Sequence, residues 1–309
     1  MIVTVTPNPS IDRTLRVPVL VRGSVHRATD TTAEAGGKGV NVARALATEG
    51  HEALAIAPMS AASVVAFRSL LGSAATLETV PIGGDVRVNV GLIEADGTVT
   101  KVNEPGPWLG EPETEALLAR AAAVAARASW VVGCGSLPPG MLPNFYVRLS
   151  RMAPSGVRVA VDADGEALRA CRGEPLALIK PNLRELEVLA GRGLTSLGEA
   201  VAAAGALVGA GVGAVLVSLG PDGAVYVDRD GATHAEAVVD GVVNPVGAGD
   251  ALLAGFLAAG GRREGLGLAV AWSIAACRSP GTQMRSVGPA DLEAVTVHDV
   301  VDSERRLIP

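Results

Sequence analysis

The sequence predicts an α/β fold with a mostly parallel sheet and helices on both faces. Short apolar runs, typical of buried strands, alternate along the chain with Ala-rich or amphipathic helical stretches. Hydrophobic residues make up 49% of the 309 residues, which is enough to bury a large core. Aromatic residues make up only 3%, so we expect that core to consist of Ala, Val and Leu.

The individual elements follow from local patterns. The predicted strands are Ile2–Thr6, Trp130–Gly133, Val157–Asp162, Leu176–Ile179 and Val215–Leu219. The predicted helices are Val40–Glu49, Pro112–Ala126 and Leu183–Leu189. The second of these has a clear start, because a proline and several glutamates fall in its first turn. The uncharged stretch 200–220 is rich in glycine, so we predict a helix to about Val208 and a strand from Ala214 instead of a membrane span.

Two segments interrupt the alternation, Arg13–Thr32 and Val86–Lys101, and both are predicted to form strands. Polar and apolar residues alternate from Asp85 to Val90, which is typical of a half-exposed strand. Asp96-Gly97 is a hairpin turn signal. We therefore predict one domain over residues 1–309 with a small β lid built from about residues 12–33 and 84–104.

Charge and cysteine content limit the function classes. The net charge of -6 and the pI near 5.3 argue against nucleic acid or an anionic membrane as a partner. An anionic substrate would therefore need locally focused positive charge. The three cysteines are scattered and show no disulfide or metal spacing, and the N-terminus resembles no targeting segment. We expect a cytoplasmic protein in a reducing compartment.

The stretch from Asn244 to Phe256 carries the strongest functional signal. A glycine turn, Gly247-Ala248-Gly249, leads directly into an apolar helix with Asp250 in its first turn. The free N–H groups at a helix start attract anions, so a carboxylate beside them needs a reason. Accepting a proton from a hydroxyl that attacks a phosphoryl group is such a reason. The structural alternative is an ordinary helix-capping Asp.

A second glycine turn, Gly36-Gly37-Lys38-Gly39, also enters a helix. Lys38 could meet a phosphate, and Asn41 could bind sugar hydroxyls; the alternative is a plain loop-to-helix turn. The spacing matches neither a P-loop nor the dinucleotide-binding fingerprint.

Loops at the ends of other predicted strands hold further candidates. Asn182 and Glu185 could hold the waters of a Mg²⁺ ion, although they would equally form a capping box. The glycines of Ser218–Gly223 leave room for a nucleotide, or form a simple hairpin turn. Ser136 could donate to a phosphate or a sugar. Asp12 could accept bonds from two sugar hydroxyls, or serve as a turn residue.

Taken together, these motifs resemble the ribokinase-like sugar kinases of the PfkB family, over essentially the whole chain. The turn with Lys38 and Asn41 is similar to the family's first signature, the run 244–256 to its second, and Asn182 with Glu185 to its magnesium motif. The resemblance implies a ribokinase-like doubly wound fold, Mg²⁺ with ATP as co-substrate, and transfer of the γ-phosphoryl group to a sugar. Three segments depart from the family pattern: 58–63, 162–165 and 278–279.

Within the family, the opening Thr6–Thr14 and the loops 103–107 and 136–140 resemble the branch that phosphorylates sugar phosphates, the 1-phosphofructokinases and tagatose-6-phosphate kinases. Residues 25–28 and the Asn-Pro-Val form of the second signature favour the former. The resemblance thus implies fructose 1-phosphate as acceptor, with tagatose 6-phosphate or fructose 6-phosphate as alternatives. A non-catalytic sugar-phosphate-binding regulator is a further alternative, but the intact run 247–250 argues against it.

The resemblance also implies a role for each site residue. Asp250 would be the catalytic base, and Gly247, Ala248 and Gly249 the anion hole. ATP would contact Lys180, Asn182, Ser218, Gly220, Gly223, Gly249 and Gly281. The sugar would contact Asp12, Gly37, Lys38 and Asn41, and its phosphate Arg87, with Arg27 and Ser136 as weaker candidates. Glu185 and Asn182 would hold the metal through water. The β lid is a candidate surface for a homodimer.

Overall fold

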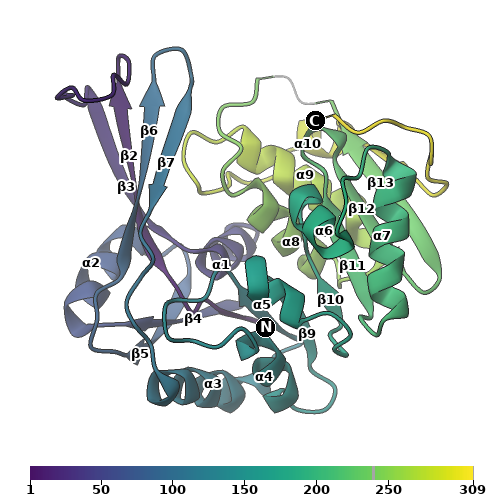
Figure 1. Cartoon of the computed structure of the whole chain (residues 1–309), viewed down its shortest axis with the longest axis horizontal. Coiled ribbons are helices and arrows are strands. Elements are labelled where there is room, and N and C mark those ends of the chain that lie inside the picture. Colours follow the sequence, from purple (N-terminus) through teal and green to yellow (C-terminus); the bar gives the residue numbers. More distant parts are fainter. Residues whose placement is uncertain (239–240, 309) are drawn as a thin grey trace.

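The computed structural model describes residues 1–238 and 241–308, and its centre is a ten-stranded sheet (Figure 1). Its strands, in spatial order, are β14 (Val295–His298), β13 (Gly231–Ala237), β12 (Ala224–Asp228), β11 (Ala214–Ser218), β10 (Leu178–Ile179), β9 (Arg158–Asp162), β8 (Trp130–Cys134), β1 (Ile2–Val5), β4 (Ala53–Met59) and β5 (Thr76–Pro81). The seven strands from β11 to β5 pair in parallel, and β12 to β14 add to one edge in antiparallel order.

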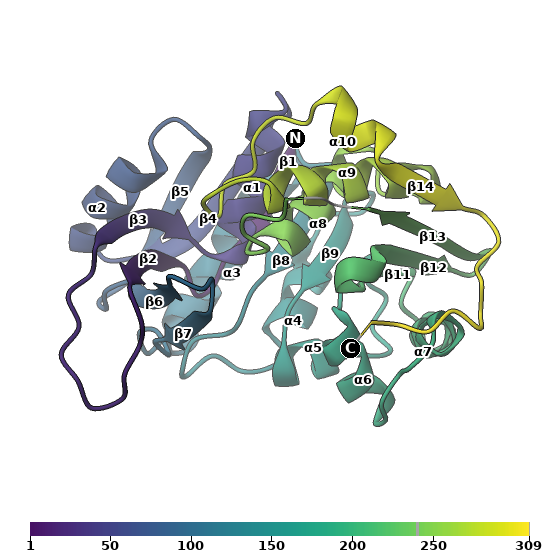
Figure 2. The same cartoon turned by 90° about the horizontal axis from the view of Figure 1, so that it is seen from above.

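Helices cover both faces of this sheet (Figure 2). One face carries α1 (Lys38–Thr48), α2 (Ala61–Leu71), α8 (Ala248–Ala258), α9 (Leu266–Cys277) and α10 (Pro289–Glu293), with the short turn η2 (Arg263–Gly265). The other carries α3 (Glu111–Ala125), α4 (Phe145–Met152), α5 (Gly165–Ala170), α6 (Leu183–Ala190) and α7 (Leu197–Gly209). Neighbouring strand residues such as Val131 and Val132 enter opposite cores, as the period of two requires. The predicted doubly wound fold is confirmed.

Most local predictions are correct to within a few residues, but residues 18–29 of the predicted strand segment Arg13–Thr32 form a loop. The uncharged stretch forms α7 and then β11, and no helix within 1–238 or 241–308 is long and apolar enough to span a bilayer. The predicted strand from Leu176 shortens to Leu178–Ile179, because the N–H of Leu176 bonds to Glu174 in a tight turn. The strands β4 and β5 and the antiparallel strands β12 to β14 are not among the strands predicted from the sequence.

A separate four-stranded sheet projects from the body (Figure 1). Its order is β3 (Asp30–Gly36), β2 (Ser10–Val17), β6 (Arg87–Glu94) and β7 (Val99–Asn103). At its base, Ser10 of β2 lies between Gly36 and Arg87. The turn between β6 and β7 contains Asp96 and Gly97 as predicted: the side chain of Asp96 accepts the N–H of Thr98, and Gly97 has a φ of 89°. Every residue of β6 is partly exposed, so its burial does not alternate as its sequence does.

The contact between α8 and α9 allows a test of core packing. A methyl group on Gly255 of α8 would lie 2.8 Å from Cγ of Trp272 and 3.0 Å from Cα of Ala269. We expect Gly255→Ala to lower the free energy of unfolding by about 1–3 kcal/mol, because overpacking outweighs the gain in helix propensity. Chemical denaturation measures this change.

Gly205 of α7 is the matched control, since a methyl group there would meet nothing within 4 Å. Gly205→Ala should raise the free energy of unfolding by about 0.5–1 kcal/mol. Equal effects of the two substitutions would contradict the tight contact between α8 and α9.

Candidate active site

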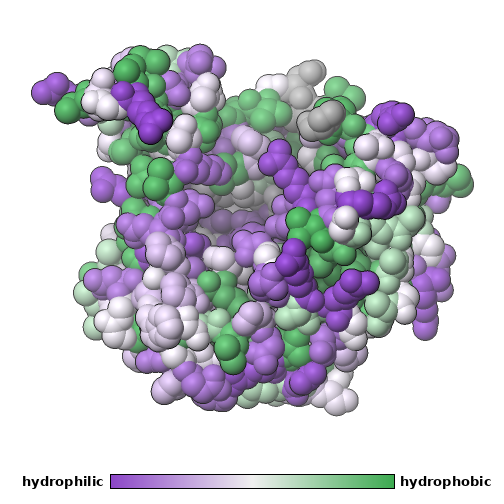
Figure 3. All heavy atoms as spheres, viewed as in Figure 1, coloured by the Kyte–Doolittle hydropathy of each residue, from purple (hydrophilic) through white to green (hydrophobic). Residues whose placement is uncertain are grey.

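The candidate site forms where the carboxyl ends of the parallel strands meet the first turns of α1 and α8. Asp162 ends β9, Lys180 follows β10, and Ser218 ends β11. The side-chain amide of Asn41 in α1 donates to Oδ2 of Asp250 in α8 at 2.8 Å, across 209 positions of sequence. In Figure 3 the surface is hollowed between the four-stranded sheet and the body, and the floor of this hollow is hydrophilic. Ligands bind at this edge of open α/β sheets.

The start of α8 combines a glycine turn with a nearby ammonium group. Gly247 is the N-cap with a φ of 87°, and a Cβ there would lie 2.7 Å from the carbonyl oxygen of Thr282, so glycine is required. The first-turn N–H groups have no helical carbonyl to bond. A Cβ on Gly249 would lie 3.4 Å from Nζ of Lys180, which places this ammonium group beside the same turn. A buried ammonium group therefore lies beside the first turn of α8.

Asp250 does not cap this helix, because no side-chain bond caps α8 and its carboxylate bonds to Asn41 instead. Asp250 as a residue is only 8% exposed. Burial, and then the negative charge of Asp162, raise the pKa of Asp250 to about 6, while Lys38, the bond from Asn41 and Lys180 oppose the rise. A carboxylate with this pKa is mostly ionised at neutral pH and is still an effective proton acceptor.

Asp162 forms ion pairs with two lysines. Its oxygens lie 2.7 Å from Nζ of Lys38 and 2.9 Å from Nζ of Lys180, and its side chain is 1% exposed. Burial alone would raise the pKa of Asp162, but the two ammonium groups lower it below the usual value. Burial likewise opposes the charge on Lys38, and Asp162 with other carboxylates nevertheless raises the pKa of that lysine. No role was predicted for Asp162, which belongs to one of the segments that depart from the family pattern. Its position at the end of a predicted strand was the feature that could have indicated a place in the site.

A series of hydrogen bonds, which was not predicted from the sequence, holds the side chain of Asn41 in place. Nη2 of Arg44 donates to Oδ1 of Asn41 at 2.7 Å and to Oγ1 of Thr282 at 3.0 Å, which fixes the amide orientation. Thr282 in turn donates to Glu34 of β3 at 3.1 Å. Gly281 packs against the same glutamate and lines neither of the two cavities described below.

Asp12 lies at the base of the four-stranded sheet. Its Oδ1 accepts bonds from Oγ of Ser10 at 2.7 Å and from Nδ2 of Asn89 at 2.9 Å. A side chain on Gly36 would overlap this carboxylate, so the glycine permits the close approach of β3. Gly37 is the N-cap of α1, with a φ of 111°. Asn89 was not predicted, although its place on the alternating strand after Arg87 was visible.

A cavity of about 470 Å³ contains Arg87 and Ser136, two of the predicted phosphate contacts. Arg87 donates one bond, to the carbonyl of Glu104 at 3.1 Å, and its buried Nε has no partner among the described residues. Burial lowers the pKa of Arg87. Asn8, which was not predicted, lines the same cavity and donates to Ser136 at 3.4 Å. Unsatisfied guanidinium hydrogens in a cavity favour an anionic ligand.

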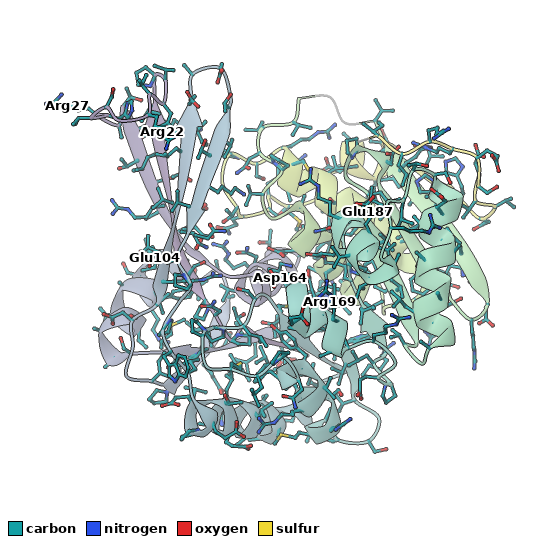
Figure 4. All side chains as sticks on the ribbon, in the orientation of Figure 1. Arg22, Arg27, Glu104, Asp164, Arg169 and Glu187 are labelled. Atoms are coloured by element: carbon teal, nitrogen blue, oxygen red, sulfur yellow. The ribbon has the colours of Figure 1, made fainter. Side chains whose placement is uncertain are left out.

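The acidic residue Asp164 also lines this smaller cavity, and Figure 4 shows it facing the hollow. Arg27 does not line either cavity: Figure 4 shows it at the outer tip of the four-stranded sheet. The strand pair β2 and β3 carries the loop 18–29 away from the strand ends, so the structure does not bring Arg27 to the other predicted phosphate contacts.

A larger cavity of about 650 Å³ unites the predicted ATP contacts Asn182, Ser218, Gly220, Gly223 and Gly249. Its remaining walls are mostly apolar and include Leu252, Val270 and Ile274 of α8 and α9. A volume of this order with apolar walls and a few polar groups is typical of a small-molecule site.

Asn182 and Glu185 form the capping box of α6. Oδ1 of Asn182 accepts the N–H of Glu185 at 2.9 Å, and Oε2 of Glu185 accepts the N–H of Asn182 at 2.8 Å. Burial raises the pKa of Glu185, although Lys38 and the bond from Asn182 oppose the rise. The capping bonds use the amide oxygen of Asn182, and only the second oxygen of Glu185 remains for an ion. One free oxygen is too few to coordinate a metal ion directly. Because Mg²⁺ retains several waters in proteins, this oxygen is better suited to bind a hydrated Mg²⁺ ion through one of those waters.

Two of the departures from the family pattern have structural roles here. Ser60 caps α2, and both Ser60 and Ser63 donate to Asp85, at 2.7 and 3.1 Å. Arg278 pairs with the buried Asp291 at 2.7 Å, and Ser279 donates to the carbonyl of Ala275.

Comparison with known proteins identifies the family. Residues 5–284 match the pfkB family carbohydrate kinase model. The chain is 36% identical to a 1-phosphofructokinase of Haloferax volcanii, over 98% of this chain and 96% of the relative. It is 35% identical to a 1-phosphofructokinase of Xanthomonas campestris pv. campestris, over 83% of each chain. The crystal structure of phosphofructokinase-2 from Escherichia coli in complex with fructose-6-phosphate superposes with a TM-score of 0.83, at 31% identity, over 94% of this chain and 96% of that one. The chain therefore belongs to the pfkB family of carbohydrate kinases.

Proposed function

We propose that this kinase transfers the γ-phosphoryl group of ATP to fructose 1-phosphate, giving fructose 1,6-bisphosphate and ADP. The observation that carries the proposal is the buried carboxylate of Asp250 at the anion-binding start of α8, with an elevated pKa and no capping role. The relatives named 1-phosphofructokinase support the choice of acceptor.

In the proposed reaction, Asp250 removes the proton of the acceptor hydroxyl as that oxygen forms a bond to the γ-phosphorus. The bond from the γ-phosphorus to the oxygen that bridges it to the β-phosphorus breaks, and that electron pair leaves on ADP. The N–H group of Gly249 and the ammonium of Lys180 stabilise the charge on the phosphoryl oxygens, whereas the N–H of Ala248 already donates to the carbonyl of Pro245 at 3.3 Å. Lys38, paired with Asp162, adds positive charge at the same edge.

For the two substrates we propose separate cavities. ATP would occupy the larger one, against Ser218 and Gly223. Mg²⁺ bound to ATP would neutralise phosphate charge, and Glu185 would hold it through water. The sugar would bond to Asp12 and Asn41, and its phosphate would bond to Arg87 and Ser136 in the smaller cavity.

We also propose that the four-stranded sheet acts as a lid, because it carries Asp12, Asn89 and Arg87 at its base. Closing on the sugar phosphate would exclude water from the phosphoryl group. The outer strand β7 has exposed Val99 and Val102, so a homodimer through this sheet belongs to the same proposal.

Fructose 6-phosphate is the second candidate acceptor, because phosphofructokinase-2, which has been solved with that sugar phosphate, has the same fold over nearly the whole chain.

An assay of ATP consumption with fructose 1-phosphate, fructose 6-phosphate, tagatose 6-phosphate, free fructose and no sugar tests the function. We expect the highest kcat/KM with fructose 1-phosphate and very little ATP hydrolysis without sugar. Asp250→Asn should lower kcat by about 10²–10⁴-fold, because the base is lost while the size is kept. Consumption that is independent of sugar, or an Asn variant above a tenth of wild-type kcat, would overturn the assignment.

The pH dependence tests the role of Asn41. Only ionised Asp250 can accept a proton, so kcat/KM should fall as the pH falls through about 6. The bond from Asn41 lowers the pKa of Asp250. In Asn41→Ala this acid limb should therefore move to higher pH, on the order of one pH unit.

Asn89→Ala is the matched control, since Asn89 donates to Asp12 and not to Asp250. It should raise KM for the sugar phosphate and leave the acid limb in place. If the fall of kcat/KM at low pH occurs at the same pH in both variants, it arises from titration of the substrate phosphate and not of Asp250.

Arg87→Ala should raise KM for the sugar phosphate on the order of tenfold to a hundredfold, since a charge-assisted bond contributes about 1.5–3 kcal/mol. KM for ATP should change little, because Arg87 lines the smaller cavity and not the larger one. Steady-state kinetics with each substrate varied in turn provide the comparison. Equal rises in both constants would argue against a phosphate contact.

A further inference from the structure

The last residues of the chain reach the larger cavity. After β14, the chain passes along the edge of the main sheet and returns toward α6 and α7 (Figure 2). Ile308 lines the cavity together with Val242, and both side chains are more than half exposed, at 53% and 54%. Two exposed apolar side chains from distant segments therefore flank one opening, and a bound apolar surface would cover them.

The segment 302–308, called here the C-terminal strap, is held by main-chain bonds to the start of α7. The N–H groups of Leu197 and Gly198 donate to the carbonyls of Arg305 and Ser303, at 2.9 and 3.1 Å. The N–H of Leu307 donates to the carbonyl of Thr195 at 3.0 Å, and the Leu307 side chain is buried. The course of the strap is therefore determined by its backbone up to the cavity.

Asp222 links the strap to the loop that we assign to ATP. It ends the turn η1 (Gly220–Asp222), which begins two residues after Ser218, and is 1% exposed. Its Oδ1 accepts Nη2 of Arg305 at 3.1 Å, and its Oδ2 accepts the N–H of Ile308 at 2.7 Å. One buried carboxylate thus holds both the arginine of the strap and the residue that enters the cavity.

Arg305 has a second partner, Glu236 of β13, so it bridges two carboxylates. Glu236, His234 and His298 place their ligand atoms within 4.8 Å of one another, which is close enough for a metal ion. However, the two oxygens of Glu236 already bond to Arg305 and to His298, and the guanidinium adds positive charge beside them. We therefore assign this cluster to anchoring the strap.

We propose that the C-terminal strap forms part of the nucleotide site: Ile308 supplies an apolar wall for the base of ATP, and Arg305 is the positioning residue that holds Ile308 and the loop 218–223 together. The inference rests on the proposed function, because it takes the larger cavity to be the ATP site. A nucleotide base is a flat, largely apolar group, which suits the exposed pair Ile308 and Val242.

Calorimetric titration with ATP tests the strap directly. We expect Ile308→Ala and Arg305→Ala each to weaken ATP binding on the order of tenfold, with a matching rise in KM for ATP and no change in KM for fructose 1-phosphate. Ile308→Val keeps an apolar wall and should bind ATP nearly as the wild type does. Thermal unfolding of each variant verifies that it is folded.

Arg306→Ala is the matched control, because Arg306 is exposed and forms no ion pair within the described residues. It should leave ATP binding unchanged. Wild-type affinity in folded Ile308→Ala and Arg305→Ala would overturn the strap inference, as would equal rises in KM for both substrates. A wild-type protein that binds no ATP would instead overturn the proposed function.

Discussion

The site depends on the ion pairs that the buried carboxylate of Asp162 forms with Lys38 and Lys180. Removing such a group from water costs several kcal/mol unless it is paired, and here two ammonium groups pair it. The three charges tie the start of α1 to the ends of β9 and β10. Loss of Asp162 would leave the buried ammonium group of Lys180 without its carboxylate partner, so this ion pair favours the observed arrangement of the three elements.

The same charges set the chemistry of Asp250. Burial and the negative charge of Asp162 raise its pKa, whereas the lysines and Asn41 hold the rise to about 6. In a chain with a net charge of -6, Lys38 and Lys180 thus offset the carboxylates of Asp162 and Asp250 at the edge where a phosphate would bind. The glycines at 247 and 249 complete this arrangement, because side chains there would meet the carbonyl of Thr282 and the ammonium of Lys180.

The larger cavity also depends on segments that lie far apart in the sequence. Its walls come from the loop after β11, from α8 and α9, and from Ile308 at the end of the chain. Asp222 holds the first and last of these together through two hydrogen bonds. The shape of the cavity is therefore a property of the whole second half of the fold and not of one motif.

The sequence by itself determined the features that depend on neighbouring residues. Strand and helix positions, the glycine turn before Asp250 and the capping box of Asn182 and Glu185 all follow from short-range periodicity and backbone preference. The family could also be identified from the sequence, because each of its signatures is a continuous stretch of residues. The short strand at Leu178 and the antiparallel edge were less accessible, since strand length and pairing depend on long-range contacts.

Only the tertiary structure decided which side chains meet. Asp162 has its partners at positions 38 and 180, Asp12 receives its bond from Asn89, and Arg44 orients Asn41 through contacts with a third segment. Tertiary structure also placed Arg27 at the outer tip of a sheet and brought Ile308 into a cavity. Hydrogen bonds and ion pairs depend on distance in space, and the local sequence does not encode which strand ends come together.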